Sequence, residues 1–184
     1  MVHALYYPLL VVGATSMSIL LGCQVSLSYV SMAAVLSVFD VPEHTALSMW
    51  KVTFNRGFYL CPTQAMFSSF IFFLNAFLTF LYGQPETSSQ NSVCMLLIAG
   101  LLAISLVPFT LVIIVPLEEE LLERHRKLCR EGPQTMSQGK LHNNAAATAR
   151  AIETHRVMEK WVFLNYFRTI LPAVTVFWIW LMCI

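Results

Sequence analysis

Long uncharged stretches alternate with short charged ones along the chain, and the uncharged stretches determine its architecture. Asp, Glu, Lys and Arg are absent from residues 1–39, 57–85, 87–117 and 169–184. Because about 20 apolar residues carry an α-helix across a bilayer, the first three stretches are long enough to span it. The fourth is long enough if it begins near Trp161 and includes Arg168. The pattern predicts four spans, at about residues 7–39, 54–82, 92–117 and 161–184.

The connection between the third and fourth spans is charged and long enough to form helices of its own. Glutamates follow Leu117 and bases dominate up to Arg130, an order that complements the dipole of a helix projecting into water. An alanine-rich segment then leads into span four. We therefore expect an all-α, four-transmembrane-helix bundle, one domain over residues 1–184, with a helical hairpin at 118–160.

Composition and charge placement support a membrane protein and predict its orientation. The chain is 57% hydrophobic and 11% charged, whereas soluble domains carry about 25% charged residues. A net charge of +1 argues against a nucleic-acid partner. Outside span four, Lys and Arg occur only in residues 40–56 and 118–160, which predicts that these loops are cytoplasmic and that both termini are not. We expect the endoplasmic reticulum membrane, and a homo-oligomer is possible through the small residues of span one.

The cysteines exclude some kinds of site. The five cysteines include no C-x-x-C pair, which argues against zinc fingers and dithiol redox motifs. Cys94 and Cys183 are expected near the same boundary, where either a disulfide or two separate buried thiols would fit.

One stripe of span four combines aromatic, amide and cationic side chains. Trp161, Asn165 and Arg168 are spaced i, i+4 and i+7 and therefore share a helix face. Arg168 lies about 10 Å deeper than Trp161, where a charge costs a few kcal/mol unless it finds a partner. A purely structural role would pair Arg168 with Glu118 or Glu119, at the end of span three.

Two other spans are expected to place polar side chains near this stripe. Asn55 and Arg56 lie where span two enters the membrane. Gln24 lies in the middle of span one, where an amide normally faces the bundle interior. Segments far apart in the sequence thus bring amides, guanidiniums and carboxylates toward one interface.

Three motifs in a fixed order carry a resemblance to a known family. They are Phe54-Asn55-Arg56-Gly57 with Pro62, then Val107-Pro108-Phe109-Thr110 with Pro116, then Trp161, Asn165 and Arg168 with Leu171-Pro172. Over nearly the whole chain, this order resembles the anthrone-oxygenase-like family, small four-span membrane proteins often found in polyketide gene clusters. Family members commonly carry Thr-Asn-Asn after the second proline, where this chain has Leu117-Glu118-Glu119.

The resemblance implies oxygen-dependent oxidation of an anthrone, a hydrophobic aromatic metabolite, with O₂ as co-substrate and no obvious cofactor. Such a monooxygenase-type reaction needs a base for the acidic CH₂, donors for the developing oxyanion and a dry aromatic pocket. The candidate catalytic residues are Glu118, Glu119 and His44 as bases and Arg168, Arg56, Asn55 and Asn165 as donors, with Trp161, Trp50 and Gln24 as substrate-binding candidates.

A haem-dependent oxidase is the alternative cofactor hypothesis. No histidine lies in the middle of a span, so a haem held between two membrane histidines has no ligands. A single axial ligand from His44 or His125, or a Tyr or Cys ligand, remains open. No other metal site is predicted.

Two functions without catalysis are also compatible with the chain. A tetraspan scaffold or partner protein would use the serine-rich first span and the charged hairpin as contact surfaces. A transporter is disfavoured because the paired broken helices of inverted repeats are missing from the pattern. The converging polar residues favour the enzyme, since a scaffold gains little from burying Arg168 beside amides.

Overall fold

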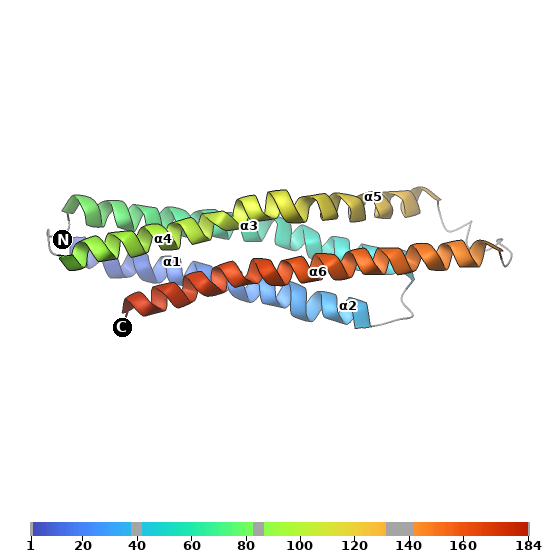
Figure 1. Ribbon diagram of the computed structural model, residues 1–184, viewed down its shortest axis with the longest axis horizontal. Helices are drawn as coiled ribbons and strands as arrows, with labels where there is room; N and C mark the ends of the chain where they lie inside the picture. The colour runs from blue at the N-terminus through green and yellow to red at the C-terminus, as the bar shows by residue number, and fades with distance from the viewer. Residues whose placement is uncertain (1, 38–41, 83–86, 132–141, 184) are drawn as a thin grey trace.

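The computed structural model describes residues 2–37, 42–82, 87–131 and 142–183, which are almost entirely helical (Figure 1). Four continuous helical rods run along the molecule. The first rod is α1 (Val2–Val25), η1 (Ser26–Met32) and α2 (Ala33–Ser37), and the second is α3 (Glu43–Tyr82). The third is α4 (Thr87–Phe109), η2 (Thr110–Ile114) and α5 (Val115–Glu131), and the fourth is α6 (His142–Cys183). The elements named η are short π-helical segments.

The rods lie side by side, and both termini are at one end of the bundle (Figure 1). The Asn75 amide of α3 donates to the Tyr6 carbonyl of α1 at 3.1 Å, and the Trp178 indole of α6 donates to the Met95 carbonyl of α4 at 3.1 Å. All four rods are long and apolar enough to cross a membrane. The protein is an integral membrane protein, and the predicted all-α four-helix bundle is confirmed.

All four rods are longer than the hydrocarbon core of a bilayer, and the three that carry charged ends are the longest. Helix α3 begins at Glu43, ahead of the predicted span at 54–82, and it continues without a break through Pro62. Its 40 residues extend about 60 Å, twice the roughly 30 Å of the hydrocarbon core. Helix α6 has 42 residues, and α4, η2 and α5 continue one another. The charged ends of these rods must therefore project beyond the membrane.

The projecting ends form a packed extension of the bundle. Arg124 of α5 makes ion pairs of 2.8 Å with Glu120 on its own helix and with Glu153 on α6. The buried Thr154 hydroxyl of α6 donates to Glu43 of α3 at 2.5 Å. Both arms of the predicted hairpin are helical, while its turn at 132–141 lies outside the described residues. The side of the membrane on which this extension lies stays a prediction.

Buried apolar side chains form two clusters along the bundle. The first cluster lies toward the termini and includes Leu10, Met17, Phe72, Ala99 and Ile179. The second lies toward the extension and includes Met32, Leu47, Trp50, Leu121 and Trp161. Buried polar side chains, among them Gln24, Asn165 and Arg168, separate the two clusters along the chain. This polar layer is where the candidate site lies.

Small and hydroxyl residues let the first rod approach α3 closely. The Ser16 hydroxyl donates to the Gln64 amide oxygen at 2.6 Å and accepts from the Ser68 hydroxyl at 2.8 Å. A Cβ atom on Gly13 would overlap the Phe72 ring, which is fully buried. Part of the serine pattern of span one therefore serves packing within one chain.

Candidate functional site

A small polar cavity lies where η1, α3, η2, α5 and α6 meet. Its volume is about 20 Å³, enough for roughly one water-sized group. Three of the predicted site residues of span four and one predicted carboxylate line it. The full lining is Leu27, Thr53, Phe54, Gly57, Phe58, Pro62, Thr110, Glu118, Trp161, Asn165 and Arg168.

Glu118 contributes a buried carboxylate to the cavity. Its side chain is 4% exposed, and its carboxylate accepts a hydrogen bond of 3.2 Å from the indole nitrogen of Trp161. Glu118 follows the π-helical segment η2, whose first residue, Thr110, also lines the cavity. Short π-helical segments occur frequently at functional sites. The charged group is therefore held at a fixed place in an apolar surrounding.

Arg168 contributes a guanidinium that lacks a full set of partners. The side chain is 7% exposed, and its Nε has no hydrogen-bond partner among the described residues. Arg168 and Glu118 attract one another electrostatically, and the Cys61 thiol lies close to the guanidinium. In the described part of the chain, however, no carboxylate lies within ion-pair distance of Arg168. The direct ion pair expected from a purely structural role is not present.

The two other predicted members of the span-four stripe also line the cavity. The Asn165 amide nitrogen donates to the Trp161 carbonyl oxygen at 2.8 Å, one helical turn earlier. Trp161 packs edge-on against Trp50, with ring centroids 6.0 Å apart, and Trp50 stacks on Phe54 at 5.3 Å. Trp50 is fully buried and does not itself line the cavity. It supports the aromatic wall from behind.

Several predicted residues lie outside the cavity lining. Asn55, Arg56 and Glu119 are exposed although their sequence neighbours line it. Gln24 is 1% exposed, and both polar atoms of its amide lack a hydrogen-bond partner within the part of the chain that the structure describes, although the Cys61 thiol lies nearby. The functional roles assigned to these residues stay predictions.

The two candidate haem-ligand histidines come together in the extension, away from the cavity lining. The His44 and His125 rings stack with centroids 6.0 Å apart, and the Cys129 sulfur lies 3.9 Å and 3.8 Å from one nitrogen of each. Burial lowers the pKa of His125, and the nearby Lys51 and His44 lower it further. Within the described ranges, no group of three or more His, Cys, Asp or Glu residues could hold a metal ion. Haem ligation by either histidine stays a prediction.

Seven lining residues are not among the predicted site residues. Four of them belong to the motifs that carry the family resemblance, namely Phe54, Gly57, Pro62 and Thr110, and three lie outside these motifs, namely Leu27, Thr53 and Phe58. Thr53 lies four residues before Gly57, so the helical period that follows from Gly57 could have indicated it. Leu27 approaches α3 at Gly57, where an added Cβ would lie 2.8 Å from the Leu27 Cδ1. That contact joins segments far apart in the sequence and leaves no local signal.

One comparison with known proteins bears on this site. A family model described as anthrone oxygenase matches residues 50–177, a range that includes every residue of the cavity lining except Leu27. No curated protein and no solved structure matches the chain.

Proposed function

The chain belongs to the anthrone oxygenase family, and on that premise we propose that it is a membrane-bound oxidoreductase that uses O₂ to oxidise a hydrophobic aromatic, polyketide-type metabolite. The observation that carries this proposal is that Glu118 and Arg168 line the same cavity without forming an ion pair. Both side chains are more than nine-tenths buried, both line one cavity, and no ion pair joins them. A base and a cationic donor thus remain free to act on a third group.

The proposed chemistry begins with proton removal. Glu118 takes a proton from the CH₂ of the anthrone. The electron pair left on that carbon delocalises onto the ketone oxygen, which becomes an oxyanion. Arg168 stabilises this oxyanion through its unpartnered Nε–H. The electron-rich carbon reduces O₂ and bonds to it as a peroxide anion, and the proton held by Glu118 returns to the outer oxygen to give a hydroperoxide at that carbon. Loss of water from the hydroperoxide leaves a ketone, so that anthrone and O₂ become anthraquinone and water.

The surroundings of the cavity suit this reaction. Aromatic rings from Phe54, Phe58 and Trp161 form part of its wall and keep the surroundings of the reacting atoms apolar. The low polarity around the carboxylate and guanidinium strengthens their electrostatic effect on the reacting atoms. No cofactor is required for these steps, and O₂ serves as co-substrate.

The chain departs from the pattern that family members commonly show, because it has Leu117-Glu118-Glu119 in place of Thr-Asn-Asn. An amide at position 118 could accept the Trp161 hydrogen bond but could not serve as a carboxylate base. We propose that Glu118 supplies the base in this chain, and that its substrate differs from those of members with the amide.

The test is turnover of 9-anthrone by the protein in lipid nanodiscs. We expect O₂-dependent formation of 9,10-anthraquinone above the rate with empty nanodiscs, with one oxygen atom from isotopically labelled O₂ in the product. Arg168→Lys should lower kcat by about a hundredfold while the bundle stays folded. Normal turnover by this variant would contradict the assigned role of Arg168.

A visible absorption spectrum separates the remaining alternatives. An intense haem band that shifts on reduction would replace the cofactor-free mechanism with a haem oxidase and direct attention to His44 and His125. If the spectrum is featureless and no O₂-dependent turnover occurs, the scaffold function is favoured. We further propose an endoplasmic reticulum location with loops 40–56 and 118–160 in the cytoplasm, on the basis of the positive charges in those loops.

A further inference from the structure

The polar cavity is too small for the substrate class that it is proposed to act on. Its volume of about 20 Å³ is space for roughly one water-sized group. A fused three-ring aromatic is many times larger. In the described conformation, the cavity can take the reacting atoms of a substrate or an O₂ molecule, and the ring system must be held by another part of the protein.

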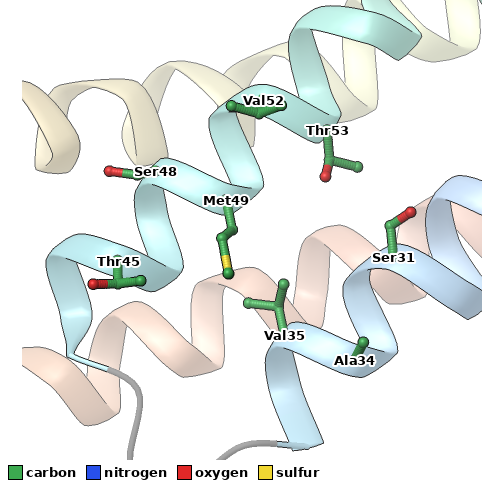
Figure 2. A pocket seen from close by; sticks show the side chains of 8 residues that line it. All are labelled: Ser31, Ala34, Val35, Thr45, Ser48, Met49, Val52 and Thr53. Atoms are coloured by element: carbon green, nitrogen blue, oxygen red, sulfur yellow. The ribbon is translucent and has the colours of Figure 1, made fainter.

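A larger groove lies beside the cavity. Its volume is about 570 Å³, within the range of about 300–1,000 Å³ that is typical of small-molecule sites. It runs between the η1–α2 segment and the first turns of α3, and Met49 of α3 points toward Val35 of α2 across it (Figure 2). The groove is lined by Ser31, Ala34, Val35, Thr45, Ser48, Met49, Val52 and Thr53, and most of its surface is apolar.

One residue and one helical segment border both the groove and the polar cavity. Thr53 lines the groove and also the polar cavity. The π-helical segment η1 contributes Ser31 to the groove and Leu27 to the cavity. A side chain and a helical segment from two different rods therefore form a common wall between the groove and the cavity that holds Glu118 and Arg168.

The hydroxyl groups of the groove distinguish it from a surface that merely contacts acyl chains. Throughout the described residues, no hydrogen-bond partner is found for the side-chain hydroxyl of Thr45 or of Thr53. These two residues lie eight positions apart on α3, about 12 Å at 1.5 Å per residue. This separation is comparable to the length of a fused three-ring system that carries polar substituents, and an acyl chain has no group to satisfy either hydroxyl.

We propose that this groove binds the ring system of the aromatic substrate and that Thr53 marks the place where the reactive carbon passes into the polar cavity. The inference rests on the proposed function and adds a binding site for the body of the substrate. The exposed side of the groove, where Met49 is 49% and Val52 is 55% exposed, leaves an opening through which a hydrophobic molecule can enter.

A variant that fills the groove tests this proposal. In Ala34→Trp, a large side chain replaces a small exposed one in the groove wall, away from Glu118 and Arg168. We expect its KM for 9-anthrone to rise by about tenfold or more, with a smaller change in kcat. The matched control is Val30→Trp, because Val30 also lies on the first rod and is 66% exposed but does not line the groove. The control should keep KM close to that of the wild type.

A direct binding measurement separates this inference from the proposed reaction. 9,10-Anthraquinone is an aromatic ketone that inserts into nearby C–H bonds on irradiation, so peptide mapping should find it at Met49, Val35 or Val52 in the wild type and not in Ala34→Trp. Labelling elsewhere, or unchanged KM in Ala34→Trp, would overturn the groove while leaving the proposed function intact. Labelling of the groove in detergent that disappears in lipid nanodiscs would also overturn it, because lipid would then be the occupant.

If the wild type binds the ketone in the groove but does not oxidise anthrone, the proposed function fails and the groove stands as an aromatic-binding site.

Discussion

The indole nitrogen of Trp161 donates a hydrogen bond of 3.2 Å to the carboxylate of Glu118, which joins α6 to α5 inside the bundle. The bond satisfies part of the hydrogen-bonding capacity of a buried charge and fixes its position next to Arg168. The same tryptophan is held from behind by Trp50 and by the Asn165 amide on its carbonyl oxygen. A carboxylate positioned in this way is pre-organised for proton transfer.

Replacing Glu118 by Gln should abolish most activity without unfolding the protein. A glutamine oxygen can still accept the Trp161 hydrogen bond, but the amide cannot take the substrate proton. Loss of a general base lowers turnover by about 10²–10⁴-fold, which an anthrone oxidation assay would measure.

Glu119→Gln is the matched control for this substitution. It removes one negative charge from the neighbouring position, but Glu119 is exposed and does not line the cavity. Its turnover should stay close to that of the wild type. Equal losses in the two variants would mean that the local charge, and not the buried base, matters.

Gly13→Ala should destabilise the bundle, because the added Cβ would overlap the ring of Phe72, which is fully buried. Overpacking of this kind costs about 1–3 kcal/mol. Thermal unfolding in detergent, followed by circular dichroism, should show a lower Tm. Gly22→Ala on the same helix has no atom within 4 Å of its added Cβ and should be neutral or slightly stabilising. Similar Tm values for the two variants would show that α1 does not pack on α3 as described.

Acid should weaken the extension through His125. Its pKa is lowered in the folded protein, chiefly by burial, so the unfolded chain binds a proton more readily than the folded one. The stabilising difference is present above the ordinary histidine pKa of about 6.5 and is lost as the pH falls below it. The Tm should therefore fall between about pH 7 and about pH 5, and His125→Asn should reduce this fall.

Cysteine labelling tests the proposed orientation. Cys129 is exposed on α5 in the charged extension, and Cys94 is exposed on α4 near the other end of the bundle. In sealed microsomes, a membrane-impermeant maleimide should modify a chain whose only cysteine is Cys129. A chain with Cys94 alone should react only after the membrane is permeabilised. The reverse pattern would place the extension in the lumen.

The sequence predicts the four rods well because the bilayer demands long apolar helices, whatever their tertiary contacts. It also predicts the stripe of Trp161, Asn165 and Arg168, since the helical period alone places these residues on one face. All three line the cavity. The start of α3 at Glu43 was harder to predict because its first turns are stabilised by contacts such as the one with Thr154 on another rod.

The sequence carries too little information to predict which of several adjacent residues faces the cavity. Phe54 and Gly57 line the cavity, whereas Asn55 and Arg56 between them are exposed. Successive residues of a helix point about 100° apart, so membership of a motif does not determine which side chain faces inward. The packing of α3 against α1 and α4, and against α5 and η1, determines which face is buried.

The division of the buried apolar residues into two clusters has a consequence for how the protein comes apart. The cluster that contains Leu47 and Leu121 lies largely in the projecting ends, where contact with water drives apolar association. The cluster that contains Phe72 and Ala99 lies among lipid-facing helices, where close packing replaces that driving force. Urea acts on surfaces that become exposed to water, so it should loosen the projecting ends at concentrations that leave the membrane helices associated. The projecting part of α5 that carries Glu118 would then lose its packing against α6 while the membrane helices stay associated. Activity would therefore disappear at lower urea concentrations than the helix content does.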